Sequence, residues 1–538
     1  MTPEMSFFGA AGTVTGSCTR IQSGKNAVLV DIGLFQGSKT VREENYRPFA
    51  FDPAALDGVL LTHAHIDHSG LLPKLFRFGF RGPVYATAGT ADLLEPMLRD
   101  SAAIQEMEVE RFNRRNRRRG REVVEPIYRR HDVEAVLTQV RRVFWEQPLP
   151  LAGGMQATFW PAGHILGSAS ISLEVPVAGG LPALRLLFSG DIGPGDHPFH
   201  QGPQAPAGVD YLILESTYGD REREAPEPAG RQALLLAEIR AALAAGGNLI
   251  IPAFAVERSQ ELLYDLDILF DTGALPAIPV FLDSPLAIAA TRIFDQHLPA
   301  VNQPGTPHPF HRSNVRYVGS VEESIGLNRI RGGAIIMAAS GMCEAGRIRH
   351  HLANALWRPE TTVLLVGYQA PGTLGRLLLE GEKRVRIHGE EIAVRARIRS
   401  LDIYSGHADR TRLLAWAAAR RPVRLGMILN HGEESARQRL QEGLVAAGFP
   451  PEHLILPQQG ARYALTHRGV VEKDPGRALA DPGLESEGVY SGEDWHNSYA
   501  RTLLRLGETV RNLPDDAARS GLLTKIHHLL DRIEGHRV

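Results

Sequence analysis

The sequence of 538 residues has only two cysteines, Cys18 and Cys343. This scarcity excludes a disulfide scaffold and a zinc cluster built from thiolates. No run of about 18 apolar residues is present that could span a membrane. The N-terminus also lacks the charged and apolar regions of a signal peptide. We therefore expect a cytoplasmic protein without a membrane partner.

An excess of charge of one sign is also lacking, since 59 basic and 61 acidic residues leave a net charge of -2. Any binding of nucleic acid would have to come from a local basic patch. Residues 111–121 are one candidate, with seven arginines and no acid, although acidic residues flank them. We interpret this stretch as a solvated helix face with ion pairs, slightly ahead of a dedicated nucleic-acid contact.

Four apolar runs in the first 200 residues end at a polar residue, namely Asp31, His63, His164 and Asp191. Apolar runs of this length, bounded by Gly or Asp, indicate sheet strands rather than helices. Layered α/β proteins place their chemistry at strand ends. These four positions are therefore candidates for one functional site.

The pattern changes to alternating strands and helices from about residue 212 to 392, which indicates a largely parallel sheet in an inserted domain. Short strands that end at a histidine then resume. The predicted division is a first domain over 1–212, an inserted domain over 213–392, a return to the first domain over 393–465, and a linker with a helical extension over 466–538. Two amphipathic helices are expected at 498–513 and 515–534, and they fit either packing against the body or self-association into a homo-oligomer.

The segment LTHAHIDHSG carries the strongest signal, since His63, His65, Asp67 and His68 lie within six residues. Imidazole and carboxylate groups suit zinc, and a catalytic zinc takes about three protein ligands. Four donors exceed that number. Adding His164, Asp191 and His431 gives seven, which favours two ions that share a bridging carboxylate. A single histidine at a strand end is usually a hydrogen-bonded loop residue, but that explanation does not suit the whole set.

These motifs resemble the metallo-β-lactamase superfamily of hydrolases. The segments LESTYGDR, ASGMCEAGRIRHHL, GYQAPGTLGR, SGHAD and NHGE resemble its nucleic-acid-processing branch, which carries an inserted β-CASP domain. That branch includes the endonuclease of messenger-RNA 3′-end cleavage and its prokaryotic relatives. The resemblance covers residues from about 5 to 465. It implies an α/β fold, a metallo-β-lactamase αββα sandwich with an inserted, mainly parallel β-CASP sheet.

The resemblance also implies residue roles. One zinc ion would be held by His63, His65 and His164, the other by Asp67, His68 and His431, with Asp191 as the bridge. Asp31 would orient a ligand histidine. Glu215, His407 and His431 match three successive motifs of the β-CASP branch, and a histidine at position 431 points towards RNA.

The expected reaction is hydrolysis of single-stranded RNA, with a hydroxide activated by two Zn²⁺ ions as the nucleophile. His407 is the expected general acid and Glu215 its partner, while Asp67 and Asp191 act at the reaction centre. A structural pair between Glu215 and His407 is the alternative. Gly-rich turns with Ser340, Gly341 and Arg376 are candidates for binding a substrate phosphate.

Two other functions fit parts of the sequence. The zinc motif alone also suits a hydrolase of small esters, lactones or thioesters, against which the insertion and the basic stretch argue. A non-catalytic RNA-binding protein is the second alternative, but such proteins usually lose ligands. A nuclease acting on DNA is a further possibility. The motifs leave the balance of endonuclease and exonuclease action open.

Overall fold

The computed structural model describes residues 2–37, 39–195, 197–223, 228–298, 309–370 and 372–477, and eight positions between 513 and 525. The chain divides into two compact units, of which one contains residues 1–37 and 41–480 and the other residues 38–40 and 481–538. All the sheets described below belong to the first unit.

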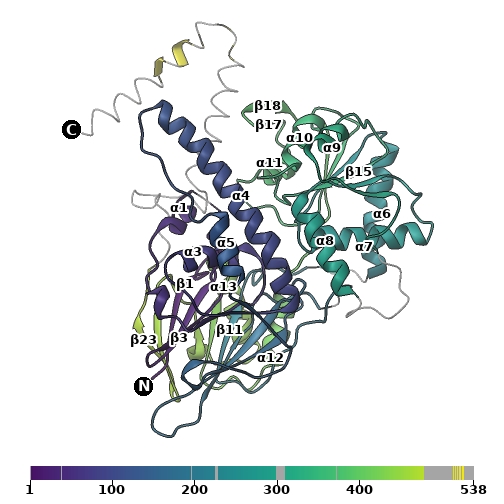
Figure 1. The fold of residues 1–538 in the computed structure, drawn as a ribbon. Coiled ribbons are helices and arrows are strands. Elements are labelled where there is room, and N and C mark those ends of the chain that lie inside the picture. The colour runs from purple at the N-terminus through teal and green to yellow at the C-terminus, as the bar shows by residue number, and fades with distance from the viewer. Residues whose placement is uncertain are drawn as a thin grey trace. The chain divides into compact units, whose positions relative to one another are not determined.

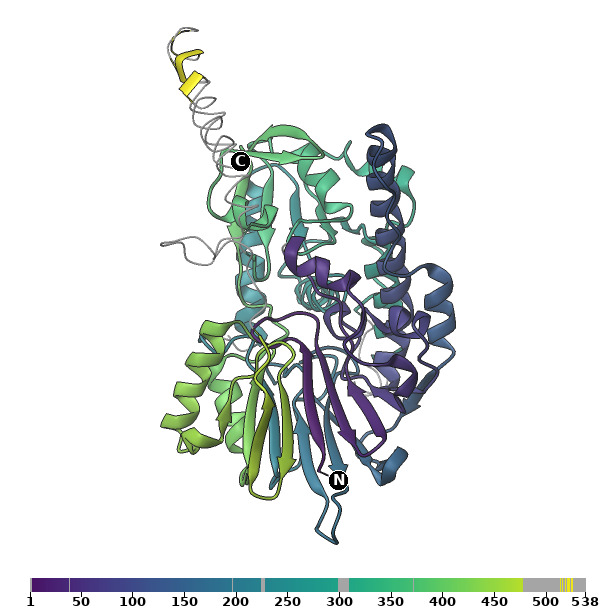
Figure 2. The same cartoon turned by 90° about the vertical axis from the view of Figure 1, so that its left-hand side faces the viewer.

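Two mixed sheets form the body of the protein (Figures 1 and 2). In spatial order the first contains β23 (Gly469–Asp474), β22 (Arg462–Thr466), β1 (Glu4–Gly9), β2 (Cys18–Ser23), β3 (Asn26–Val30), β4 (Gly58–Leu60), β5 (Val84–Thr87) and β6 (Val140–Val143). The second contains β21 (Leu454–Ile455), β20 (Gly426–Asn430), β11 (Tyr211–Glu215), β10 (Leu184–Phe188), β9 (Ala169–Val175), β8 (Gln156–Pro161) and β7 (Leu149–Pro150).

The two sheets pack face to face through alternating side chains. In β8 every second residue is buried, as expected for a strand with one face in the core. Phe7 and Val28 of the first sheet share one apolar cluster with Phe159, Ile171 and Ile213 of the second. This burial is the main stabilising contribution to the sandwich.

Helices cover the outer faces of both sheets. The first sheet is associated with α2 (Ile66–Ser69), α3 (Leu72–Arg77), α4 (Ala88–Arg118) and α5 (Arg130–Leu137), and the second with α12 (Arg410–Ala418) and α13 (Glu434–Ala446). A short helix, α1 (Lys39–Glu43), precedes them in the sequence. Leu72, Leu94 and Val133 from the first group pack on Val59 of β4. Together these layers confirm the predicted αββα sandwich.

The inserted domain is built on a six-stranded sheet whose strands all run parallel. Its order is β14 (Val315–Tyr317), β13 (Val280–Leu282), β15 (Ile335–Ala338), β12 (Leu249–Pro252), β16 (Thr362–Leu365) and β19 (Arg397–Ser400). Helix α6 (Pro228–Ala244) precedes the first of these strands in the sequence. The helices between them are α7 (Arg258–Asp271), α8 (Pro285–His297), α9 (Val321–Leu327), α10 (Ile348–Ala355) and α11 (Leu374–Leu379), and a hairpin of β17 (Arg384–Ile387) and β18 (Glu390–Ala393) precedes β19.

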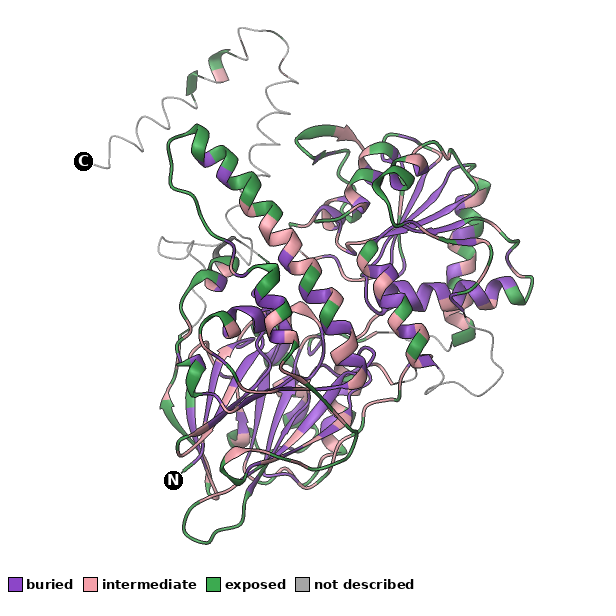
Figure 3. Ribbon diagram, in the orientation of Figure 1, coloured by how far each residue is buried: buried purple, intermediate pink, exposed green. Residues whose placement is uncertain are grey.

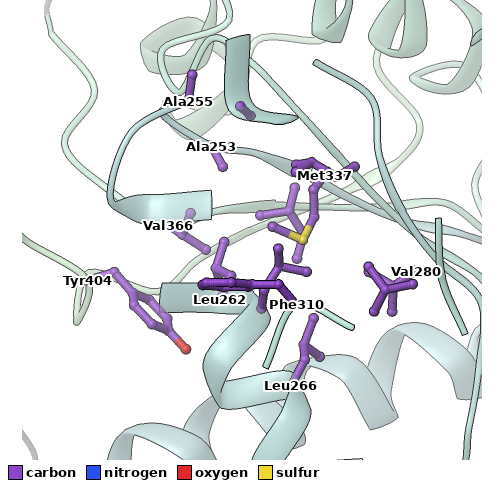
Figure 4. Packing of buried hydrophobic residues seen from close by; sticks show 14 of the residues in the cluster. Ala253, Ala255, Leu262, Leu266, Val280, Phe310, Met337, Val366 and Tyr404 are labelled. Atoms are coloured by element: carbon purple, nitrogen blue, oxygen red, sulfur yellow. The ribbon is translucent and has the colours of Figure 1, made fainter. Parts of the chain in front are cut away.

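The central strands β12, β15 and β16 are buried at every residue, because helices cover both faces of a parallel sheet. Figure 3 shows this sheet as a buried layer. Leu262 and Leu266 of α7 share a cluster with Val280 and Met337, which Figure 4 shows from close by. Ala64 belongs to the same cluster, so apolar packing joins the inserted domain to the body.

Three strands pair in a different sheet from the one that the predicted domain boundaries assign to them. Strand β11 was expected at the start of the inserted domain, but it pairs with β10 and β20 in the second sheet of the body. Strand β19 was expected in the return segment, but it pairs with β16 of the inserted sheet. Strand β23 lies in the predicted linker, yet it pairs with β22. Strand pairing depends on residues that are distant in the sequence, so the local hydrophobic pattern does not predict it.

Among the described helices, none is both long and apolar enough to cross a bilayer. The two helices predicted at 498–513 and 515–534 lie almost wholly outside the described residues, so self-association through this extension stays a prediction.

Candidate metal centre

The predicted ligands converge at one edge of the sandwich. His63 follows β4, His164 follows β8, Asp191 follows β10 and His431 follows β20. Strands β8, β10 and β20 run in the same direction, so their carboxyl ends meet at this edge. Parallel strands therefore bring together residues that lie hundreds of positions apart in the sequence.

The first group of donors contains His63, His65, His164 and Asp191. His65 Nδ1 lies 3.2 Å from His63 Nε2 and 3.1 Å from His164 Nε2. Asp191 Oδ2 lies 3.6 Å from His63 Nε2 and 3.7 Å from His164 Nε2. These four donors correspond to the first predicted ion together with the predicted bridge.

The second group contains Asp67, His68 and His431. His68 Nε2 lies 3.0 Å from His431 Nε2, and Asp67 Oδ2 lies 3.8 Å from the same atom of His431. Asp191 reaches this group as well, with Oδ2 3.4 Å from His68 Nε2 and Oδ1 3.4 Å from His431 Nδ1. Asp191 thus lies between the two groups.

Both groups fit zinc by chemistry and by spacing. Four donors at 2.0–2.1 Å from a tetrahedral zinc ion stand roughly 3.3 Å from one another, close to the separations observed here. Oδ1 of Asp191 is buried without a hydrogen-bond partner in the described part of the chain, which leaves an acceptor free for a cation.

The second ring nitrogen of several histidines is held by a neighbour. His68 Nδ1 lies 2.7 Å from Asp31 Oδ2, and His164 Nδ1 lies 2.6 Å from the carbonyl oxygen of Gly406. Both contacts suit an N–H donor at Nδ1, which leaves Nε2 as a free lone pair directed at the centre. Asp31 thus contacts one of the predicted ligand histidines, and its orienting role stays a prediction. Thr62, which the sequence analysis did not single out, donates its backbone N–H and hydroxyl to Asp31.

Burial and the neighbouring carboxylates shift the pKa values of the histidines in this centre in opposite directions. Burial, reinforced by neighbouring histidines, holds the pKa values of His63 and His164 well below the ordinary value. Burial also opposes protonation of His68, but Asp191 and Asp31 outweigh it and raise the pKa of His68 well above the ordinary value. Neutral imidazole is the form that binds a metal, and the buried carboxylates attract a cation.

His407 and Glu215 come together beside the donors. His407 Nδ1 lies 3.5 Å from Glu215 Oε1 and 4.0 Å from Asp191 Oδ2. The His407 side chain keeps 20% of its surface exposed, whereas Glu215 is buried. Burial opposes protonation of His407, but Glu215 and then Asp191 outweigh it and raise its pKa. A partly accessible imidazole with a raised pKa keeps its proton to higher pH and can donate it to a bound molecule.

The predicted phosphate-binding turns are occupied by contacts within the protein. The Ser340 hydroxyl accepts the backbone N–H groups of Glu344 and Ala345. The backbone N–H of Leu374 donates to Glu344, that of Gly375 to the carbonyl oxygen of Met342, and that of Arg376 to Thr373. The Arg376 guanidinium pairs with Glu380 at 2.7 Å, and Gly341 lies against the Phe254 ring. A role for Ser340, Gly341 and Arg376 in binding substrate stays a prediction.

A second buried cluster of histidines and acids was not anticipated. His197 Nε2 lies 2.7 Å from Glu261 Oε1 and 3.1 Å from Glu257 Oε1, which also lies 3.1 Å from His200 Nε2. The His197 and His200 rings stack at 4.0 Å with only 7° between their planes. Lone pairs in parallel planes do not converge on one ion, so we interpret this cluster as an ion-pair network. The HPFH spacing in the sequence is the only local signal for it.

Comparisons with protein families cover most of the chain. The metallo-β-lactamase superfamily model matches residues 11–214, the Beta-Casp domain model matches 259–378, and the model of the Zn-dependent metallo-hydrolase RNA specificity domain matches 391–457. The last match contains both His407 and His431.

Relatives match along most of the chain as well. A ribonuclease from Thermus thermophilus is 38% identical over 448 residues, which is 82% of this chain and 96% of the relative. The transcription termination factors FttA from Methanocaldococcus jannaschii and Thermococcus kodakarensis are 29% and 30% identical, over 80% and 78% of this chain and 67% and 64% of theirs.

The fold and the site thus define a metallo-β-lactamase hydrolase with an inserted β-CASP domain. The chain belongs to the β-CASP family of the metallo-β-lactamase superfamily. The predicted family, fold class and enzyme class, a hydrolase, are confirmed.

Proposed function

We propose that the protein is a zinc-dependent ribonuclease that hydrolyses phosphodiester bonds within single-stranded RNA. The observation that carries the proposal is the placement of His407 and Glu215 beside Asp191, next to two groups of donors that each fit a zinc ion. The matched RNA specificity domain and the relative named as a ribonuclease support RNA as the substrate.

In this proposal His63, His65 and His164 would hold one zinc ion and Asp67, His68 and His431 the other, with Asp191 available to both. When bound, the two ions supply an activated water and neutralise charge on the phosphate. Asp31 and Gly406 keep the rings of His68 and His164 in the orientation that binding needs.

His407 is the general acid in this reaction. Its protonated ring gives a proton to the oxygen that leaves as the phosphodiester bond breaks. Glu215 holds that proton on the ring by its negative charge, and the Glu215 carboxylate is itself fixed by the backbone N–H groups of Ile192 and Thr217. The Tyr218 ring, with its centroid 5.6 Å from that of His407, packs against the same imidazole.

The test compares the protein with the His407→Ala variant on single-stranded RNA labelled at the 5′ or the 3′ end. We expect internal cuts by the unaltered protein and a rate about 10²–10⁴-fold lower for the variant, at unchanged zinc content. His131→Ala is the matched control, because His131 is 75% exposed and lies outside the centre. Unchanged cutting by His407→Ala would remove the general-acid role. Hydrolysis of generic esters or lactones in place of RNA would refute the ribonuclease proposal.

A further inference from the structure

The second half of α4 leaves the body of the protein. Its first half is embedded, with Leu93, Leu94 and Leu98 buried. Beyond Ala102 the only buried residues of the helix are Asn113 and Asn116. At 1.5 Å per residue, positions 103–118 form an arm of roughly 24 Å. Figure 3 shows the far end of α4 as largely exposed.

The end of this arm is held in place by its own asparagines. Asn113 Nδ2 donates to the carbonyl oxygen of Val124, and its Oδ1 accepts the Val124 backbone N–H, both at 2.8 Å. Asn116 donates to the carbonyl oxygen of Glu122. These contacts hold the following loop against the helix, so hydrogen bonds stabilise the end of the arm.

The arginines of the arm are almost all without a carboxylate partner. Of the seven in residues 111–121, only Arg114 pairs with an acid in the described part of the chain, namely Glu110 at 3.7 Å. Two of the flanking acids are engaged elsewhere, since Glu106 pairs with Arg130 and Glu125 with Arg77. The stretch is solvated, as expected, but within the described residues the expected ion pairs are missing for six of its seven arginines.

Three of these arginines share one face of the helix. Arg111, Arg115 and Arg118 stand at positions i, i+4 and i+7, and we call them the arginine face. Beside them Phe112 keeps 50% of its surface exposed. Basic side chains interleaved with an exposed aromatic ring are the combination that binds single-stranded nucleic acid, through phosphate charge and base stacking.

The inserted domain brings Arg349 and a pair of histidines to the same place. The rings of His350, on α10, and His388, in the β17–β18 turn, stack at 4.4 Å. Burial, then His350, Arg349 and Arg111, lower the pKa of His388, while Glu390 opposes them. The field of Arg111 on α4 thus reaches the β17–β18 turn. The far end of α4 and this hairpin lie at the same end of the molecule in both views (Figures 1 and 2).

We propose that the arginine face, with Arg349, His350 and His388 of the inserted domain, forms a second binding surface for the phosphate backbone of single-stranded RNA, outside the metal centre. This inference rests on the proposed function, because the same strand would have to reach the centre. The surface adds affinity for long strands and contributes nothing to a fragment short enough to occupy the centre alone.

Binding is tested with fluorescently labelled oligouridylates of about 30 and about 6 nucleotides, in a chelator so that no cutting occurs. The variant is Arg111→Gln with Arg115→Gln and Arg118→Gln, since glutamine keeps helix propensity without the charge. Three lost phosphate contacts should reduce the slope of log affinity against log salt by about 2 for the long strand. Affinity for the short strand should stay unchanged. An unaltered slope for the long strand would overturn the proposal.

Two control variants distinguish the effect of charge on the arginine face from the effect of the protein's total charge. The triple lysine variant at the same positions should keep most of the slope, because lysine still binds phosphate as a point charge. Removing three exposed arginines elsewhere, with Arg439→Gln, Arg462→Gln and Arg468→Gln, should leave the slope unchanged. Equal binding of polyglutamate would assign the surface to an acidic protein and refute it as an RNA site. Absence of RNA cutting by the unaltered protein would refute the proposed function, while the binding result would stand on its own.

Discussion

Nε2 of His68 and Nε2 of His431 face each other at 3.0 Å, although 363 positions separate the two residues. Two nitrogen lone pairs at that distance repel unless a proton or a cation stands between them. Asp191 lies 3.4 Å from a ring nitrogen of each residue and places a negative charge beside the pair. In the proposed function this is where the second zinc ion would bind.

Replacing His431 with alanine should remove one of two zinc ions. The variant loses a donor of the second group only, because the first group does not contain His431. Zinc per chain, measured by elemental analysis after dialysis, should fall from about two to about one. His131→Ala serves as the control and should retain both ions. An unchanged zinc content in His431→Ala would exclude this residue as a ligand.

Replacing Glu215 with glutamine should shift the pH profile of kcat. The Glu215 charge raises the pKa of His407, so its removal lowers that pKa. A general acid works only while protonated, and the alkaline limb of the profile should therefore move to lower pH. The profile of the unaltered protein is the reference. If the limb stays in place while activity merely falls, Glu215 has only a structural role.

Gly33→Ala should unfold the ligand loop. A Cβ atom at Gly33 would stand 1.6 Å from the backbone oxygen of Asp67, and backbone cannot move aside as a side chain can. We expect a loss of about 3–5 kcal/mol of unfolding free energy, together with loss of bound zinc. Gly319→Ala is the control, since its added Cβ meets no atom within 4 Å. Equal stability of the two variants, measured by denaturant unfolding, would contradict this account.

Glu261 should stabilise the fold in a pH-dependent way. Burial opposes its ionisation, but Arg258 and then His197 outweigh burial and lower the pKa of Glu261 to about 2 from 4.5. A carboxyl with a lowered folded pKa stabilises fully above the unfolded value and loses that effect as pH falls towards the folded value. Ionised Glu261 therefore contributes about 3 kcal/mol to the free energy of unfolding above pH 4.5, and this contribution is lost as the pH falls towards 2.

The measurement compares the unfolding free energy of the protein and of Glu261→Gln across this range of pH. The difference between them should narrow as the pH falls from about 5 to about 3. Glu442→Gln is the control, because the Glu442 side chain is 63% exposed and its pair with Arg439 contributes little. A difference for Glu261→Gln that does not vary with pH would refute the assignment.

Much of the site could be predicted from the sequence because its motifs are local. His63, His65, Asp67 and His68 lie within one loop and its helix, where spacing alone indicates metal binding. The network of His197, Glu257 and Glu261 could not be predicted, since it joins a loop of the body to the first turn of α7. Contacts between domains depend on how the two domains pack, and the hydrophobic periodicity of the sequence does not predict that packing.

The sequence by itself determined the donor chemistry, the two kinds of sheet and the family, because residue type and hydrophobic period are local properties of the chain. The tertiary structure decided that β11 and β19 belong to the sheets opposite to those expected, since strand pairing depends on distant partners. It also decided that, among the described residues, six of the seven arginines in 111–121 have no acidic partner. Whether a charged side chain meets an opposite charge is set by the packing of the elements around it.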